Sequence, residues 1–332
     1  MLFCNLVLIK YALLMTIISD NIEKAVEILQ EGDLVAIPTE TVYGLAGNIY
    51  NEVAIRKIFE VKQRPLFNPL IVHLHSIEQV DDIASEFPAK AKQLAEAFWP
   101  GSLTLVLKKN PTIPDVITAG KDTVAVRIPN HPVTLELLRM LPFPLAAPSA
   151  NPFNRISPTN AQHVESYFKD SIRMILDGGE CKNGLESTII GFEDNEPVLY
   201  RLGSISKEEI EKVVGEVKVK NREKNTPNAP GMLAKHYAPR TKTYLIDDLT
   251  DCPVEIEKKR VGLLSFTGVT DISGFNHIEI LSESGDLAEA AANLYKALHK
   301  LDEMQLDIII AERLPDFGLG KSINDRLERA VK

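Results

Sequence analysis

Short apolar runs alternate with amphipathic segments along most of this chain of 332 residues. Apolar runs bounded by turn residues are typical of buried strands, and apolar positions spaced three and four apart are typical of helices. Strands are accordingly predicted at 34–37, 70–74, 103–108, 123–128, 145–148, 173–177, 187–192 and 198–202. Helices are predicted at 52–61, 88–98, 132–140, 158–168 and 206–214. This alternation of strands and helices predicts an α/β fold.

Two helix starts have the spacing of a capping box, in which a side chain at the start and a glutamate three residues later satisfy each other's free amides. Asp20 and Glu23 precede an apolar helical stripe that ends near Gly32. Ser206 and Glu209 begin the last helix of the same region. Both patterns predict where these helices begin.

A polar, proline-rich stretch divides the chain into two predicted domains. The first domain is predicted at 16–215, the linker at 216–240 and a smaller α/β domain at 241–332. The smaller domain has strands predicted at 243–246, 261–266 and 307–311, and helices predicted at 286–301 and 321–331. The linker contains APGMLAKHYAP, whose residue mix is too specific for a plain spacer, so we expect it to contribute to function.

Residues 1–15 are mostly apolar, but Lys10 interrupts them and they are too short to span a bilayer. They form an added strand, a signal peptide, or an extension upstream of a true translation start at Met15. We favour the last interpretation. No long apolar segment follows, so we expect a soluble, cytoplasmic protein with no membrane partner.

The composition is that of an ordinary globular protein, with 45% hydrophobic and 25% charged residues. The net charge of −9 argues against broad, non-specific affinity for nucleic acid, although it is compatible with a local basic groove. Cys4, Cys181 and Cys252 are scattered, so they predict reduced thiols and neither a zinc site nor a disulfide framework. The sequence has no P-loop, nucleophile elbow, kinase signature or zinc-protease motif.

Polar side chains follow the first predicted strand in the segment PTETVYGL at 38–45. Pro38 ends the strand because it lacks a backbone donor, and two hydroxyls, a carboxylate and a phenol come next. Polar groups where a strand leaves an α/β sheet are placed where such folds bind ligands. The same groups could instead form a turn whose hydroxyls satisfy backbone amides, and for this segment taken alone that interpretation is favoured.

Lys62 and Arg64 follow the second helix, and Pro65 keeps the chain extended after them. Alternate side chains of an extended segment share a face, so both cations can converge on a polyphosphate. A solvated basic helix end is the alternative, and for these two residues taken alone that interpretation is favoured. His73 and His75 share a face of the next strand and could bind a metal. A single polar contact by one of them is favoured, because no carboxylate or cysteine partner is evident.

Arg127 lies within an apolar strand, where a buried charge needs a partner. That partner could be a carboxylate of the protein or of a ligand, and the sequence favours neither.

Small polar residues cluster in PSAN at 148–151 and in ISPT at 156–159, where Thr159 could cap a helix whose N-terminus receives a phosphate. GLESTII at 184–190 again places polar residues at a strand start.

Together these segments resemble the YrdC/Sua5 family. The resemblance rests on PTETVYGL, K-x-R-P followed by NPL, WPGSLT, TVAVRIP, PSAN, SPT and GLESTII, in this order. The APGMLAKHYAP linker and the second α/β domain resemble the longer Sua5 form, and the match covers nearly the whole chain from about residue 16. The resemblance implies a YrdC-like twisted open sheet with flanking helices, followed by the linker and a smaller Rossmann-like α/β domain.

The resemblance also implies the activity of an L-threonylcarbamoyladenylate synthase, a nucleotidyltransferase. Such an enzyme condenses L-threonine, bicarbonate or CO₂, and ATP, and releases pyrophosphate. Its product supplies the threonylcarbamoyladenosine modification at tRNA position 37, which a separate tRNA threonylcarbamoyltransferase attaches. Mg²⁺ is expected to arrive on the ATP phosphates, without direct protein ligands, and any contact with tRNA is expected to be weak.

Roles for individual residues follow from the same resemblance. The residues expected to bind threonine are Thr39, His73, Arg127, Ala147 and Ser187, with Arg127 meeting the carboxylate. The residues expected to bind ATP are Lys62, Arg64, Thr123, Ser149, Asn151, Ser157, Arg201, His236 and Tyr237. Lys62 and Arg64 are expected to be catalytic through charge neutralisation and alignment, because no catalytic base is evident. The linker is expected to close over the site as a lid.

Two other functions compete with the synthase. A YrdC-like domain could be an RNA-binding module without adenylation activity, although the acidic net charge and the 6% content of aromatic residues disfavour this. Carbamoyl transfer, as in hydrogenase maturation factors, would need acylphosphatase and zinc-finger-like segments that this sequence lacks. Pyrophosphate release that depends on ATP and threonine separates the synthase from a binding module.

Overall fold

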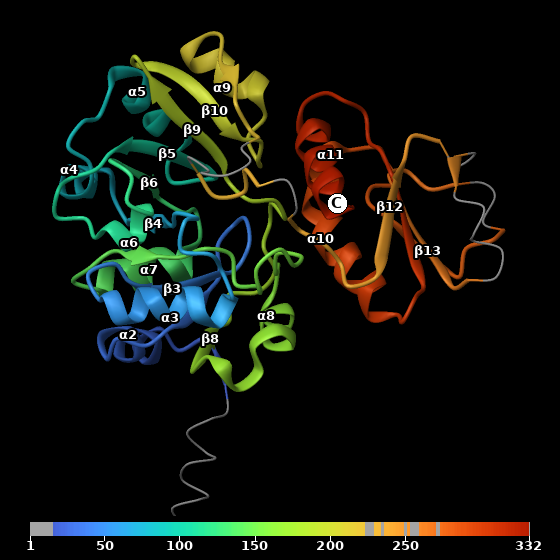
Figure 1. Cartoon of the computed structure of the whole chain (residues 1–332), viewed down its shortest axis with the longest axis horizontal. Helices are drawn as coiled ribbons and strands as arrows, with labels where there is room; N and C mark the ends of the chain where they lie inside the picture. The colour runs from blue at the N-terminus through green and yellow to red at the C-terminus, as the bar shows by residue number, and fades with distance from the viewer. Residues whose placement is uncertain are drawn as a thin grey trace, which may run out of the picture.

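Two sheets of different size form the frame of the molecule (Figure 1). The computed structural model describes residues 16–222, 229–233, 236–248, 251–252, 259–269 and 273–331. The predicted extension at 1–15 lies outside these residues, as do 223–228 and 234–235 of the predicted linker. Within the described residues, no helix combines the length and the apolar character that crossing a membrane requires.

The larger sheet is mixed and, within the described residues, has the strand order β1-β8-β2-β3-β7-β4-β6-β5-β9-β10-β11. Its strands are β1 (Ile17–Ser19), β2 (Val35–Ile37), β3 (Gly44–Asn48), β4 (Ile71–His73), β5 (Leu103–Lys108), β6 (Thr123–Arg127), β7 (Leu145–Ala146), β8 (Met174–Leu176), β9 (Thr188–Glu193), β10 (Glu196–Arg201) and β11 (Lys218–Val219). Strands β4 and β6 run parallel and place His73 opposite Arg127. Two residues predicted for the site therefore lie side by side on neighbouring strands.

Helices cover this sheet and bury its apolar side chains. They are α2 (Ile22–Gln30), α3 (Glu52–Lys62), α4 (Val80–Ile83), α5 (Ala89–Phe98), α6 (Asp115–Thr118), α7 (Pro132–Met140), α8 (Ala161–Phe168) and α9 (Lys207–Val214). The largest buried cluster joins the sheet to α3, α5, α8 and α9, and a second cluster joins it to α2 and α7. Full burial of one aliphatic side chain contributes about 1.5–3 kcal/mol, so these clusters fix the positions of the helices.

The alternation of side chains along β4 separates the core from the face that carries the site. Val72 belongs to the largest core cluster, whereas Ile71 packs on the other face with Met232 of the linker. His73 shares the face of Ile71 because side chains alternate along a strand. The same alternation on β6 places Arg127 beside it. This face of the sheet therefore presents polar residues toward the linker.

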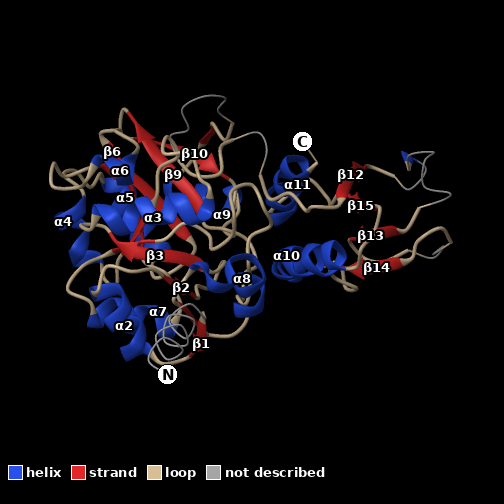
Figure 2. Ribbon diagram, turned by 60° about the horizontal axis from the view of Figure 1, so that its bottom comes forward, coloured by secondary structure: helices blue, strands red, loops and turns tan. Residues whose placement is uncertain are grey.

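The smaller sheet has four strands within the described residues, all parallel, in the order β12-β15-β13-β14. Its elements are β12 (Lys242–Ile246), β13 (Val261–Ser265), β14 (His277–Ile280), α10 (Leu287–Glu303), β15 (Ile308–Glu312) and α11 (Leu319–Ala330). Both Figure 1 and Figure 2 show α10 and α11 lying between this sheet and the first domain. The prediction of an α/β fold with a second, Rossmann-like domain is confirmed.

The caps of α2 and α8 differ from those predicted. Asn21, and not Asp20, caps α2, since its side chain accepts a hydrogen bond from the Lys24 amide at 2.6 Å. Asn160, and not Thr159, caps α8. In both cases an asparagine, which is among the best N-cap residues, stands one position closer to the helix and takes the role. The capping box predicted for α9 is confirmed.

Four short strands, β1, β3, β11 and β14, were not predicted. Strand β3 has the sequence GLAGN, whose glycines and alanine have low strand propensity. It forms because β2 and β7 pair with it, one on each side. Strand β11 extends the larger sheet to Val219, past the domain boundary predicted at 215.

Candidate active site

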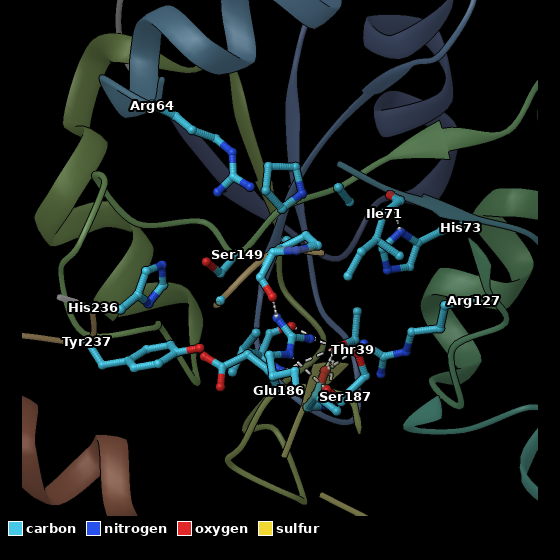
Figure 3. Close-up of a pocket in the computed structure, with 18 residues that line it drawn as sticks. Thr39, Arg64, Ile71, His73, Arg127, Ser149, Glu186, Ser187, His236 and Tyr237 are labelled. Carbon is cyan, nitrogen blue, oxygen red and sulfur yellow. Dashed lines mark hydrogen bonds between the residues drawn. The ribbon is translucent and has the colours of Figure 1, made fainter. Parts of the chain in front are cut away.

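A cavity of about 560 Å³, measured with its opening to solvent, lies where the larger sheet meets the linker. Figure 3 shows His73 and Arg127 on one side of this cavity and Arg64, His236 and Tyr237 on the opposite side. The predicted site residues that line it are Thr39, Arg64, His73, Arg127, Ala147, Ser149, Ser187, Arg201, His236 and Tyr237. The structure thus brings together most of the residues predicted from the sequence.

The wall between β2 and β3 is a tight turn organised by the hydroxyl of Thr39. Thr39 Oγ1 donates to the Val42 carbonyl at 2.6 Å and accepts from the Val42 amide at 3.2 Å. It also lies 2.8 Å from Thr41 Oγ1. The hydroxyls therefore close a turn, as one interpretation of PTETVYGL predicts, and both threonines also line the cavity.

Arg127 pairs with a carboxylate of the protein. Its Nη2 lies 2.7 Å from Glu40 Oε1, and both side chains are buried. Nη1 donates to Thr41 Oγ1 at 2.9 Å, and Nε donates to the Gly101 carbonyl at 3.2 Å. Burial alone would raise the pKa of Glu40, but the charge and hydrogen bonding of Arg127 hold that pKa below its usual value. Because a guanidinium has five N–H groups, Arg127 can still donate to a ligand.

His73 lies beside Arg127 and is neutral. Burial, followed by the charge of Arg127, lowers its pKa to about 3. Its Nδ1 lies 3.2 Å from the Ile71 carbonyl, which can only accept, so Nδ1 carries the proton and Nε2 can accept a hydrogen bond. His75 does not line the cavity. The arrangement fits a single polar contact by His73 better than a metal-binding pair.

Buried cations gather on the opposite side of the cavity. Arg64 and Arg201 line it, and Lys62 is buried close to Arg64. Burial and the charge of Arg201 lower the pKa of Arg64 to about 9. Burial and the charge of Arg64 likewise lower the pKa of Lys62 well below its usual value. Like charges buried together are unfavourable until an anion neutralises them, so this side suits a polyphosphate.

Lys62 supports the cavity wall from behind and does not line the cavity. Its ammonium group donates to the carbonyls of Ser149 and Asn151 and so holds the loop that follows β7. Asn151 is also buried behind the wall, where its amide nitrogen donates to the Arg155 carbonyl at 2.9 Å. Of these three residues only Ser149 lines the cavity, and the ATP contacts of Lys62 and Asn151 stay predictions.

Thr123 is not brought to the cavity. It begins β6 and lines a separate hollow with Tyr200. Side chains alternate along a strand, so Thr123 shares a face of the sheet with Arg127. Between these two residues, that face is covered by an apolar cluster that includes Ala125 and Met232. The contact of Thr123 with ATP stays a prediction.

His236 and Tyr237 of the linker close the cationic side of the cavity. Tyr237 has a φ of 62°, in the left-handed region that is uncommon for a residue other than glycine and recurs at functional sites. Gly231 packs closely here, since a Cβ at this position would lie 2.7 Å from the side chain of Arg201. Among the described residues, the buried Tyr237 hydroxyl has no hydrogen-bond partner. Buried polar groups nearly always have one, so this hydroxyl is available to a ligand.

Glu186 connects the cavity with the second domain. Its carboxylate accepts from Ser157 Oγ at 2.6 Å, from Tyr295 Oη at 3.0 Å and from Arg326 Nε at 2.8 Å. Tyr295 lies on α10 and Arg326 on α11. Burial alone would raise the pKa of Glu186, but the charges of Arg326 and Arg201 hold it below its usual value. Ser157, predicted to bind ATP, is thus engaged by this carboxylate and does not line the cavity.

The sequence alone predicts no role for Glu40, Thr41, Glu186 or Arg326. The first three lie within PTETVYGL and GLESTII, so their motifs were identified although their partners were not. Arg326 is one of several charged residues in a mixed-charge helix, and nothing local distinguishes it as buried. Only the packing of the second domain against the first reveals it.

The residues at the cavity do not form a direct ligand set for Mg²⁺. Among the described residues, no group of three or more His, Cys, Asp or Glu side chains is placed to hold a metal ion. Glu186, which lines the cavity, is paired with Arg326, and Glu40, which does not line it, is paired with Arg127. A metal ion carried on the phosphates of a ligand is compatible with this arrangement.

The fold defines a two-domain α/β protein. Its cavity has one side lined by Arg127 and neutral polar side chains and an opposite side lined by Arg64 and Arg201. The Sua5/YciO/YrdC family model, described as "Telomere recombination", matches residues 27–203. A second model, "Threonylcarbamoyl-AMP synthase, C-terminal domain", matches residues 205–331. The chain belongs to the Sua5/YrdC family.

Similar proteins share both domains with this chain. The threonylcarbamoyl-AMP synthase of Pyrococcus abyssi is 42% identical over 93% of this chain and 94% of its own length. The threonylcarbamoyl-AMP synthase of Bacillus subtilis is 41% identical over 94% of this chain and 93% of its own. A crystal structure of P. abyssi Sua5 complexed with L-threonine has a TM-score of 0.87 and 41% identity, covering 95% of this chain and 98% of that one.

Proposed function

We propose that this protein is a threonylcarbamoyl-AMP synthase. The observation that carries the proposal is its similarity to the synthases of P. abyssi and B. subtilis over 93% and 94% of the chain. The cavity supports it, because one side offers an arginine and neutral polar groups to an amino acid and the other offers buried cations to a polyphosphate. The reaction condenses L-threonine, bicarbonate or CO₂, and ATP to threonylcarbamoyl-AMP and pyrophosphate.

L-Threonine is the proposed ligand of the side lined by Thr39, His73 and Arg127 (Figure 3). Arg127 can donate its remaining N–H groups to the amino-acid carboxylate, while Glu40 keeps the guanidinium in place. Nε2 of the neutral His73 can accept a hydrogen bond from the ammonium or hydroxyl group of threonine. Ala147 and Ser187 complete the proposed threonine site.

ATP is the proposed ligand of the cationic side. Arg64 and Arg201 would share the charge of the phosphates, and an anion between them would relieve the repulsion that lowers the pKa of Arg64. The Tyr237 hydroxyl, which lacks a protein partner among the described residues, could bind the nucleotide. Mg²⁺ on the phosphates would neutralise part of their charge. Lys62 contributes by holding the loop that presents Ser149.

The proposed chemistry depends on positioning more than on a protein nucleophile. The neutral amine of threonine attacks CO₂ and releases a proton to solvent, giving a carbamate. A carbamate oxygen then attacks the α-phosphorus of ATP, the bond from that phosphorus to the bridging oxygen breaks, and pyrophosphate leaves. Holding both reactants in one cavity and stabilising the charge with buried cations supply the rate enhancement.

The product is proposed to pass to a separate tRNA threonylcarbamoyltransferase, which modifies tRNA at position 37. We propose accordingly that the enzyme acts in the cytoplasm. Direct contact between the enzyme and tRNA is expected to be weak, because the chain has a net charge of −9.

Incubation with ATP, labelled bicarbonate and either threonine or serine tests the proposed function. With threonine, we expect release of pyrophosphate and entry of the label into an adenylate. With serine, which lacks the methyl group, we expect a rate lower by roughly tenfold or more. A protein that releases no pyrophosphate with either amino acid would contradict the synthase and favour an RNA-binding module.

A further inference from the structure

Arg326 of α11 is a buried cation that the proposed chemistry does not use directly. Its Nε donates to Glu186 Oε2 at 2.8 Å and its Nη1 to Asp325 Oδ2 at 2.8 Å. Its Nη2 donates to the Leu202 carbonyl at 2.6 Å. Glu186 and Leu202 belong to the first domain, so one side chain bridges the two domains. A guanidinium buried to this extent is tolerated because each of its nitrogens is paired.

The same guanidinium stacks on a residue that lines the cavity. Arg326 Cζ lies 4.8 Å from the centroid of the Tyr237 ring, within the range of a cation–π interaction. Tyr295 of α10 packs against the same ring, with 5.8 Å between centroids and 29° between planes. Two side chains of the second domain thus hold the ring of Tyr237 while its hydroxyl faces the cavity.

We propose that Arg326 is a positioning residue that fixes Tyr237 and Glu186 for nucleotide binding, so that the docked second domain completes the ATP side of the cavity. This inference rests on the proposed synthase function. Arg326 does not line the cavity and therefore acts through the two residues it holds. Among the described residues, the hydrogen bonds of the His73 and Arg127 side chains are made within the first domain. The threonine side should therefore not depend on Arg326.

The variant R326K tests this role. Lysine keeps a positive charge beside Glu186 but loses the planar group that stacks on Tyr237 and bonds to Leu202. We expect the KM for ATP in pyrophosphate release to rise about tenfold or more, and the KM for threonine to change by less than about twofold. Lys321→Met is a matched control, because it removes another cation of α11 that pairs with the first domain, at 2.7 Å from Glu208 and outside the cavity. This control should leave both KM values close to wild type.

A double-mutant cycle with Tyr237→Leu separates positioning from a general loss of stability. Tyr237→Leu removes the stacked ring but retains the pair between Arg326 and Glu186, and it should itself raise the KM for ATP. If Arg326 acts through Tyr237 as well as Glu186, R326K should raise the KM for ATP less in that background than in wild type, because only its contact with Glu186 is left to lose. Effects that multiply, an equal rise in the KM for threonine, or an unchanged KM for ATP in R326K would each overturn the inference.

Two further measurements keep the inference testable. Tyr295→Phe removes one hydrogen bond to Glu186 without adding or removing a buried charge, so it should raise the KM for ATP even if R326K does not fold. Calorimetric titration of ATP into the same variants measures nucleotide affinity without catalysis. If wild type releases no pyrophosphate but R326K still binds ATP more weakly than wild type, the proposed function is rejected and the inference about Arg326 stands. Equal ATP binding by wild type and R326K would reject the inference alone.

Discussion

Arg127 and Lys62 are both buried cations at the site, but their charges are balanced differently. Arg127 has Glu40 at 2.7 Å, so its position is set before a ligand arrives. Within the described residues, the Lys62 ammonium group has the carbonyls of Ser149 and Asn151 as its only hydrogen-bond partners, and the nearby Arg64 repels it. The sequence could identify both cations as candidates. It could not show which of them has a carboxylate partner, because that depends on segments far apart in the chain.

Replacing Lys62 by methionine tests its position behind the cavity wall. The Asn151 carbonyl loses its donor, which costs about 1–3 kcal/mol, while the Ser149 carbonyl still accepts from the Asn151 amide at 3.0 Å. Removing a buried charge that Arg64 repels acts in the opposite direction. We therefore expect the free energy of unfolding to change by less than about 2 kcal/mol, while turnover falls by at least about tenfold because the loop at 149–151 loses its support. Urea unfolding and pyrophosphate release measure the two effects.

Lys57→Met is the matched control for this variant. Lys57 lies on the same helix and pairs with Asp33 at 2.6 Å in a partly exposed ion pair. Such a pair contributes about 0–1 kcal/mol, so this variant should retain wild-type turnover. Wild-type turnover in Lys62→Met would exclude both a phosphate contact and a supporting role for Lys62.

At the scale of elements, local patterns predicted the parts of the fold that carry their own signal. Strands β4, β5 and β6 are apolar runs bounded by turn residues, and α3 and α10 have a clear apolar stripe. Strand β3 could not be predicted, because its pairing with β2 and β7, and not its composition, makes it a strand. The same holds for the site. Its motifs are short segments that the sequence alone could identify, whereas the docking of the linker and of α11 depends on tertiary contacts.

Met232 anchors the linker to the sheet and offers a test of the linker's role. It is 1% exposed and packs with Tyr200 on the face that carries the site. Aspartate at this position would bury an unpaired charge at a cost of several kcal/mol, so the linker should lose this contact. Because Tyr237 belongs to the same linker, we expect Met232→Asp to weaken ATP binding by about tenfold or more and to spare threonine binding. Calorimetric titration with each ligand measures both.

Met140→Asp is the matched control for the linker variant. Met140 lies on α7 and is 43% exposed, so the same substitution there buries no charge and should leave both affinities unchanged. Unchanged ATP affinity in Met232→Asp would contradict the expectation that the linker closes the site.

At the scale of the whole molecule, the two domains meet through an interface that continues into the cavity. Buried apolar residues of both domains form one cluster, which includes Leu185 of the first domain and Leu294 of the second. Polar contacts add to it, from Tyr295 and Arg326 to Glu186. Because Glu186 lines the cavity, we expect domain docking and nucleotide binding to be thermodynamically linked.

A stacked pair of histidines is expected to make this interface sensitive to pH. His163 of α8 and His299 of α10 lie with ring centroids 3.8 Å apart and 18° between planes. Burial and the charge of His299 lower the pKa of His163 to about 3, and burial lowers the pKa of His299 to about 4. The charges of Glu180 and Lys296, an ion pair at 2.8 Å across the same interface, act on His163 in opposite directions. Unfolded histidine has a pKa of about 6.5, so the unfolded chain binds more protons below that pH.

The stability that the neutral histidine pair contributes is therefore present above about pH 6.5 and is lost as the pH falls toward 4. His299→Gln can keep the hydrogen bond to the Ser157 carbonyl, 3.2 Å from Nε2, while removing a ring that titrates. We expect its free energy of unfolding, measured in urea from about pH 4 to 7, to fall less steeply on acidification than that of wild type. Ser322→Ala removes the hydrogen bond to the Gly203 carbonyl at 2.8 Å across the same interface without changing a titratable group. It should lower stability by about 0.5–1.5 kcal/mol at every pH, and parallel curves for wild type and His299→Gln would contradict the role of the stacked pair.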